Sequence, residues 1–264
     1  MKKGLPSLEA YEQVVSKIIK ARSDVNSINP ISDEFPEWGL VEAYQVQQLV
    51  NQARRNAGGR VVGYKIGLTS KAVQNQLGVD QPDYGELFAD MERLSGSNVD
   101  CSKLIAPKAE GEIAFVFRND LDKKDLTFVE LMSEIEFFMP VVEIVDSVVT
   151  NWKIKLVDTV ADNASSALYV VGNKKFSPCG IDFSMLELCI KAKGMTDIHG
   201  KGVACLGNPL LATWWLARKM IDLGTPISKG HLVLSGALAP MVNLTPGINL
   251  EFDFLGLDKI IINT

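Results

Sequence analysis

Residues 107–117, with the sequence PKAEGEIAFVF, show the period-two alternation that is typical of a β-strand. One face of this strand is apolar and suited to burial, because it carries Ile113, Phe115 and Phe117. The opposite face presents two carboxylates, Glu110 and Glu112, whose Cα atoms lie about 6.5–7 Å apart when the chain is extended. The segment therefore predicts a strand with one buried face and one acidic face.

Two carboxylates at this spacing can converge on one hard cation, which prefers several oxygen ligands. Gly111 between them leaves the other face bare and indicates a close approach of backbone or ligand. Residues 140–147, PVVEIVDS, form a second valine-rich strand with Glu143 at its centre. A buried carboxylate needs a cation or a hydrogen-bond partner, so Glu143 is the natural third ligand. The alternative for all three is the solvated face of an ordinary or edge strand.

Composition excludes several classes of protein. A net charge of −5 argues against a nucleic-acid partner. The chain lacks a run of about 18 apolar residues, which argues against a transmembrane helix, and no apolar block follows its basic first residues, which argues against a signal peptide. The four scattered cysteines fit reduced thiols of a cytoplasmic protein. With only two histidines, any metal would be held mainly by oxygen.

The order of the elements suggests two parts. A helix is expected over residues 7–22 with Ser7 as its N-cap, and a second from about Val41 to the glycines at 58–59. Strands dominate the rest of the chain, which predicts a helical N-terminal region over 1–60 and a β-rich catalytic domain over 61–264. Within the latter, Thr127 begins a helix that Pro140 is expected to end.

Three further polar residues are candidates for a site. Lys65 lies between two glycines on one face of the expected strand 60–67, although most lysines are simply exposed. Asp83 lies in the turn-rich stretch 79–85, where aspartates usually serve turn geometry. Ser165, in a polar stretch that precedes an apolar strand, can bind an oxyacid or cap a turn.

Together these motifs resemble the 2-hydroxypenta-2,4-dienoate (2-keto-4-pentenoate) hydratases, a branch of the fumarylacetoacetate hydrolase superfamily. The resemblance runs from about residue 36 to residue 262 and depends on the order of the motifs rather than on any one of them. The motifs are VVGYKIGLTS, LGVDQPDYGELFADM, PKAEGEIAFVF, PVVEIVDS, VDTVADNASS, LGNPLLATWWLARKM and LVLSGALAPMV.

The resemblance implies an α+β fold, in which mixed β-sheets roll into a sandwich or barrel behind a small helical N-terminal region. It implies Mg²⁺ or Mn²⁺ as the cofactor and a homo-oligomer, often based on pentamers, that can associate with the decarboxylase of its pathway. The residues that match the motifs of the family are Glu110, Glu112 and Glu143 for the metal, Lys65 and Asp83 for catalysis, and Ser165 for substrate binding.

The implied activity is hydration of 2-hydroxypenta-2,4-dienoate (2-oxopent-4-enoate) to 4-hydroxy-2-oxopentanoate, a step in the catabolism of aromatic compounds by meta-cleavage. Lys65 would shuttle a proton or stabilise the enolate, provided that burial and the nearby cation lower its pKa. Asp83 would orient or deprotonate the water, and Ser165 would bind the substrate carboxylate.

Three alternatives stay open. The first is the sister activity, 4-oxalocrotonate (2-oxo-3-hexenedioate) decarboxylase, whose members often lack an acid at the position of Asp83. The second is a non-catalytic subunit that scaffolds that enzyme, against which the intact set of acidic residues and Lys65 argues. The third is a C–C bond hydrolase, for which the metal-site strands offer no histidine. Asn208 stands where relatives often have histidine, which leaves the substrate preference open.

Overall fold

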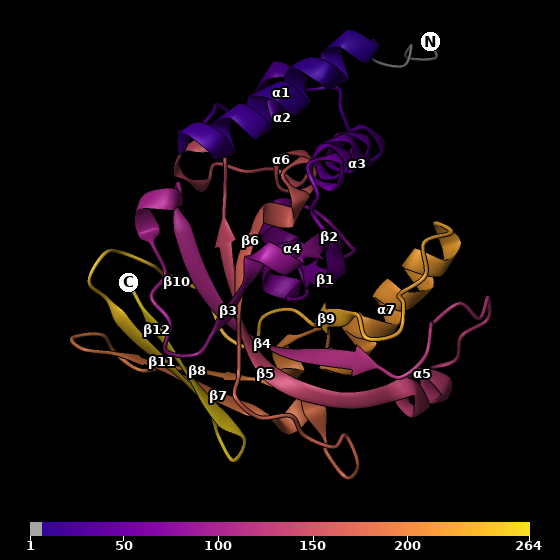
Figure 1. Ribbon diagram of the computed structural model, residues 1–264, viewed down its shortest axis with the longest axis vertical. Helices are drawn as coiled ribbons and strands as arrows, with labels where there is room; N and C mark the ends of the chain where they lie inside the picture. Colours follow the sequence, from indigo (N-terminus) through magenta and orange to yellow (C-terminus); the bar gives the residue numbers. More distant parts are fainter. Residues whose placement is uncertain (1–6) are drawn as a thin grey trace.

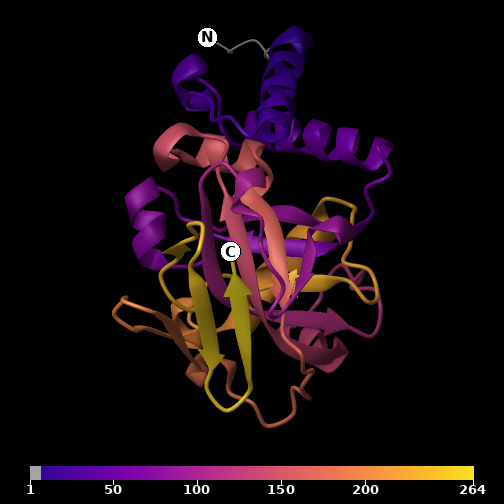
Figure 2. The ribbon, with the colours of Figure 1, turned by 60° about the vertical axis from the view of Figure 1, so that its left-hand side comes forward.

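The computed structural model describes residues 7–264. The basic first residues, on which the prediction against a signal peptide depends, lie outside the described residues. A helical layer lies at one end of two β-sheets (Figures 1 and 2), and the predicted α+β class is confirmed. This layer contains α1 Leu8–Asp24, α2 Ile31–Glu34 and α3 Leu40–Asn56.

The N-terminal helices share a hydrophobic core with a segment that is distant in sequence. The Ser7 hydroxyl caps α1 by accepting a hydrogen bond from the Ala10 amide at 3.3 Å, as predicted. The buried face of α1, with Val14 and Ile18, packs in a cluster that also contains Val149 and Val160. Val160 belongs to helix α6, Leu156–Ala161, against which α3 packs. The N-terminal helices thus pack against helix α6, which immediately precedes the turn that contains Ser165.

The larger sheet has eight strands in the order β2-β1-β9-β4-β5-β6-β3, and β10 pairs with β4. Its central strands β4 and β5 are the acidic strands predicted from the sequence, and they pair antiparallel along almost their whole length. The bounds of the eight strands are β1 Val61–Gly67, β2 Asp83–Phe88, β3 Glu92–Leu94, β4 Pro107–Phe117, β5 Ile135–Asp146, β6 Ser166–Val171, β9 Leu232–Leu234 and β10 Val242–Asn243.

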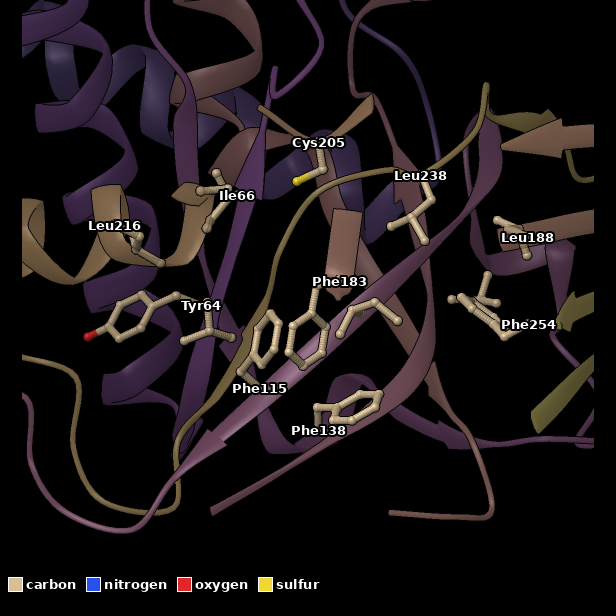
Figure 3. Packing of buried hydrophobic residues seen from close by; sticks show 14 of the residues in the cluster. Tyr64, Ile66, Phe115, Phe138, Phe183, Leu188, Cys205, Leu216, Leu238 and Phe254 are labelled. Carbon is tan, nitrogen blue, oxygen red and sulfur yellow. The ribbon is translucent and has the colours of Figure 1, made fainter. Parts of the chain in front are cut away.

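The smaller sheet, in the order β12-β11-β7-β8, is antiparallel and covers one face of the larger sheet. Side chains from both sheets contribute to one hydrophobic core, in which Phe115 of the larger sheet lies beside Phe183, and Leu188 of the smaller sheet lies near Phe254 (Figure 3). Gly111 lies at this contact, where a Cβ atom would come within 2.5 Å of Leu188 Cδ2. The predicted close approach at Gly111 is therefore made by the second sheet. Its strands are β7 Glu187–Ala192, β8 Ile198–Lys201, β11 Asn249–Phe254 and β12 Asp258–Asn263.

The remaining helices are α4 Lys71–Leu77, α5 Phe128–Glu134 and α7 Pro209–Asp222. The predicted caps are present: Ser70 accepts from the Val73 amide at 3.2 Å, and Asn208 accepts from the Leu210 amide at 2.9 Å. Over residues 7–264 no helix combines the length and the apolar character that a membrane crossing requires.

The prediction that Pro140 ends a helix is wrong. Helix α5 ends at Glu134, and Pro140 lies inside β5 opposite Ile113 of β4. The Pro140 carbonyl accepts a hydrogen bond from the Gly172 amide at 3.0 Å, just after the end of β6. The C=O of a strand residue and its N–H point to the same edge of the strand, so the missing N–H of Pro140 faces β6 and not β4. A strand tolerates proline where no ladder hydrogen bond is lost.

Candidate active site and metal centre

Three buried carboxylates meet on the face of the larger sheet that points away from the smaller one. Glu110 and Glu112 alternate along β4, and Glu143 on β5 is the direct register partner of Glu110. One oxygen of each lies within 4.8 Å of the others. Glu112 and Glu143 are fully buried, and Glu110 is 9% exposed. The alternative of an exposed or edge strand is therefore wrong, since β5 is covered on both edges by β4 and β6.

The cluster fits a hard divalent cation. Glu112 Oε1 and Glu143 Oε1 are buried without a hydrogen-bond partner, which is costly unless a cation compensates them, and Glu143 Oε2 is compensated only by the Lys65 ammonium at 3.1 Å. The other oxygen of Glu112 accepts the Gly236 amide at 2.6 Å, which fixes the orientation of that carboxylate. Three carboxylates leave about three positions of an octahedral ion for substrate and water.

Lys65 brings an ammonium group to this cluster from β1. Its side chain is buried, and Nζ lies 3.1 Å from Glu143 Oε2 and donates a hydrogen bond to the Ala164 carbonyl at 3.1 Å. Burial by itself lowers the Lys65 pKa, but the surrounding acids, led by Glu143 and Asp83, outweigh it and raise the pKa above its usual value. A lowered Lys65 pKa was expected from burial together with the nearby cation, so that expectation stays a prediction for the metal-bound protein.

Asp83 lies opposite Gly67 at the start of β2, so the predicted loop is replaced by a strand at this residue. Both of its oxygens are buried without a hydrogen-bond partner. Burial is the main cause that raises the Asp83 pKa to about 6, against the opposing effect of Lys65. Glycine is required at position 67, because a Cβ atom there would collide with the Asp83 carboxylate.

Ser165 is buried in a turn that connects α6 to β6. Its hydroxyl lies 3.3 Å from the Thr159 hydroxyl. The residue before it, Ala164, provides the carbonyl that accepts from Lys65, so the turn lies directly beside the carboxylate cluster. The structure thus brings the six predicted residues into one region. Asn208 caps α7, and its side-chain hydrogen bond is with that helix.

Sequence reasoning missed two backbone groups of this site, the Gly236 amide and the Ala164 carbonyl. A backbone group leaves no mark of its own on a sequence. The available signal was positional, since Gly236 lies in LSGALAPMV and Ala164 lies in VDTVADNASS, two of the motifs that carry the family resemblance.

The clustered acids make a testable prediction about stability and pH. Burial and the neighbouring Glu143 raise the Glu110 pKa to about 7, and burial raises the Asp83 pKa to about 6. Between about pH 4.5 and pH 7 the folded ion-free protein therefore holds protons that the unfolded chain has lost, so its stability falls as the pH rises. Each unit of raised pKa corresponds to about 1.4 kcal/mol.

In EDTA, we expect Tm to fall by at least about 5 °C between pH 5 and pH 7.5. In saturating Mg²⁺ the fall should be smaller, because the ion binds the deprotonated carboxylates. Differential scanning calorimetry at several pH values measures both curves, and Glu110→Gln should flatten the EDTA curve. A gap between the two curves that stays constant with pH would contradict this account.

Solved structures define the class of fold. The chain superimposes with a TM-score of 0.94 on a 4-oxalocrotonate decarboxylase from Pseudomonas putida G7, complexed with magnesium and adipate, at 31% identity and 99% coverage of both chains. It superimposes with a TM-score of 0.59 on the fumarylacetoacetate hydrolase from Exiguobacterium antarcticum, at 10% identity, over 78% of this chain and 75% of that one. The fold is that of the fumarylacetoacetate hydrolases.

Sequence relatives narrow this class. A 2-keto-4-pentenoate hydratase from Paraburkholderia xenovorans (strain LB400) is 44% identical over 94% of this chain and 93% of its own. The TodF product hydratase of Pseudomonas putida (strain F1) is 46% identical over 95% of this chain and 94% of its own. The chain belongs to the 2-keto-4-pentenoate hydratase family of the fumarylacetoacetate hydrolase superfamily. No protein-family model matches it.

Proposed function

We propose that this protein is a metal-dependent hydratase that converts 2-hydroxypenta-2,4-dienoate, through its 2-oxo tautomer, into 4-hydroxy-2-oxopentanoate during the catabolism of aromatic compounds. The observation that carries the proposal is the buried cluster of three carboxylates beside Lys65, in a chain 44% identical to a 2-keto-4-pentenoate hydratase.

Glu110, Glu112 and Glu143 would hold the cation, Mg²⁺ or Mn²⁺, because carboxylate oxygens are the donors that these hard ions prefer. The magnesium in the structurally similar decarboxylase supports this choice. Such an ion supplies Lewis-acid polarisation of the C2 oxygen of the substrate.

Lys65 would stabilise negative charge as it develops on the C2 oxygen. Its raised pKa keeps the ammonium protonated at neutral pH, so Nζ is suited to donate a hydrogen bond or a proton at that oxygen. Of the two roles considered from the sequence, the electrostatics of the ion-free site favour enolate stabilisation.

Asp83 is the better candidate for the group that accepts a proton. Its oxygens are buried and unpaired, and with a pKa raised to about 6 it is ionised at neutral pH yet basic enough to accept a proton. Asp83 would orient and deprotonate the water that adds at C4. Ser165, next to Ala164, would donate its hydroxyl hydrogen to the substrate carboxylate, and Thr159 would hold that hydroxyl in place.

The experiment mixes the purified protein and Mg²⁺ or Mn²⁺ with freshly prepared 2-hydroxypenta-2,4-dienoate. The dienol absorbance is followed, the product is identified by mass spectrometry and CO₂ is measured. We expect absorbance to disappear with gain of one water, no CO₂, and no reaction in EDTA. Failure to consume the dienol with either metal would reject the proposal.

The alternative is 4-oxalocrotonate decarboxylase, which the TM-score of 0.94 favours. The lower identity to that enzyme, 31% against 44% for the hydratase, and the acid at Asp83 support hydration instead. Release of CO₂ from 2-oxo-3-hexenedioate at a rate that exceeds hydration of the dienoate would reverse this assignment.

We further propose, from the family resemblance, a cytoplasmic homo-oligomer based on pentamers, which can associate with the decarboxylase of its pathway. The boundary near residue 60, between a helical region and a β-rich catalytic domain, belongs to the same proposal. Light scattering coupled to size-exclusion chromatography tests the oligomeric state.

A further inference from the structure

The turn before β6 has an unusual backbone. Asn163, Ala164 and Ser165 are three successive residues in the left-handed region, with φ of 53°, 52° and 54°. Residues with a Cβ atom rarely adopt this conformation even singly, so the surrounding structure must hold the turn in place. The turn provides both the carbonyl that accepts from Lys65 and the proposed substrate ligand Ser165.

The Asn163 side chain anchors the turn to β2. Its Oδ1 accepts the Glu86 amide at 2.8 Å, and its Nδ2 donates to the Glu86 carbonyl at 2.9 Å. The side-chain Nδ2 of Asn51, in α3, donates to the same Oδ1 at 3.0 Å. These contacts fix the side of the turn that faces β2. They do not involve Asp162, the residue that immediately precedes the turn, whose side chain has other partners.

Asp162 is held by a single residue of the N-terminal helix α1. Arg22 Nη2 donates to both carboxylate oxygens of Asp162, at 2.8 and 2.7 Å. The same guanidinium donates from Nη1 to Asp146 Oδ2 at 2.7 Å and from Nη2 to the Asp146 carbonyl. The Val148 backbone amide also donates a hydrogen bond to Asp162 Oδ2 at 3.0 Å. Burial raises the Asp162 pKa to about 6, and Arg22 opposes this shift.

We infer that Arg22 is a positioning residue of the active site: by holding Asp162, it keeps the Asn163–Ser165 turn left-handed, so that the Ala164 carbonyl and Ser165 stay beside Lys65. This inference rests on the proposed function. If Arg22 has this role, helix α1 contributes to catalysis although it lies about 140 residues away from the turn in sequence.

The same helix offers a matched control. Lys17 of α1 pairs with Glu34 of α2 at 2.6 Å, and both side chains are partly exposed, at 39% and 43%. This ion pair ties α1 to its neighbour without touching Asp162 or the turn. If Arg22 merely attached α1 to the protein, Lys17→Ala and Arg22→Ala would differ only in stability.

A cavity gives direct access to Arg22. Its volume is about 720 Å³, and its lining includes Arg22, Asp146, Asp162, Asn163 and Ser166. The Arg22 side chain is 28% exposed. A guanidinium ion from solvent can therefore enter the space that Arg22→Ala vacates and bind the two aspartates, whereas urea has the same shape without the charge.

The test compares Arg22→Ala, Arg22→Lys and Lys17→Ala in the hydratase assay, at saturating Mg²⁺ and well below the Tm of each variant. We expect kcat of Arg22→Ala to fall about 10- to 100-fold with KM changed less than about threefold, since small misplacements of catalytic groups act on kcat. Arg22→Lys should be intermediate, because lysine lacks the bidentate fork. Lys17→Ala should stay within about twofold of the parent protein.

Guanidinium chloride at about 20 mM should restore the kcat of Arg22→Ala several-fold, while urea and sodium chloride at the same concentration should not. Hydrogen exchange provides a readout without activity: the Ser165 amide, which donates to the Asp162 carbonyl at 2.8 Å, should exchange faster in Arg22→Ala. Exchange in α7 should be unchanged.

A lower Tm with parental kcat and parental exchange at Ser165 would overturn the inference, as would rescue by urea equal to that by guanidinium. If Arg22→Ala does not fold, Asp162→Asn replaces it and should lose kcat to a similar extent; parental kcat there would also overturn the inference. Absence of hydratase activity in the parent protein would instead reject the proposed function, and the exchange comparison would still decide the role of Arg22.

Discussion

Replacing Glu143 by glutamine is expected to abolish metal-dependent turnover while the protein stays folded. The substitution keeps the volume of the side chain but removes the charge of one of the three converging carboxylates. Loss of Lewis-acid stabilisation worth several kcal/mol corresponds to a fall in kcat of about a thousandfold or more. Steady-state kinetics with 2-hydroxypenta-2,4-dienoate across a Mg²⁺ titration measures the change.

Stability separates this loss from unfolding. In EDTA, Glu143→Gln should stay folded with a Tm close to that of the parent protein. The variant loses the ion pair with Lys65, but it also loses the repulsion between Glu143 and the neighbouring Glu110 and Glu112, which still face the Lys65 ammonium. Mg²⁺ should raise the Tm of the parent protein but not that of the variant. Glu187→Gln, at an exposed residue of β7 that pairs with Lys201, is the control and should keep both turnover and the response to Mg²⁺. Normal activity in Glu143→Gln would remove Glu143 from the proposed metal shell.

The acidic faces of β4 and β5 could be predicted because a strand has a strict two-residue period. Once Ile113 and Phe115 are assigned to the core, the position of Glu110 and Glu112 on the other face follows without any tertiary information. The pairing that places Glu143 opposite Glu110 is not contained in that period. What followed from the sequence was only the role of Glu143 as the third ligand, because a buried carboxylate needs a cation or a hydrogen-bond partner.

Features that depend on non-local packing could not be predicted. Asp83 is in a strand because β1 pairs with it, although its local sequence favours a turn. The Lys65 pKa is raised by acids from three other strands, and the local sequence of β1 does not contain this effect. Arg22 meets Asp162 across 140 residues. Its position four residues after the buried Ile18 places it beside the buried face of α1, but the periodicity of the helix does not identify its partner.

Replacing Lys65 by methionine is expected to lower kcat about a hundred- to a thousandfold and to change KM by less than about threefold. The reason is that the ammonium stabilises charge that appears at the C2 oxygen only as the reaction proceeds, so its loss raises the energy of the transition state more than that of the bound substrate. Lys201→Met is the control, because that lysine is exposed and pairs with Glu187 outside the site. Kinetics at saturating Mg²⁺ provide kcat and KM separately.

The same variant tests the electrostatic account of Lys65 in a second way. Without the ammonium, the buried acids Asp83, Glu110 and Glu112 lose their shared counter-charge, so their protonated forms become more favourable. Mg²⁺ binding to Lys65→Met should then release more protons than binding to the parent protein at pH 7, which calorimetry in buffers of different ionisation enthalpy measures. An unchanged proton release would contradict the role of Lys65 as the counter-charge of these acids. A change in KM with a parental kcat would show that Lys65 serves to bind the substrate and does not stabilise the reacting oxygen.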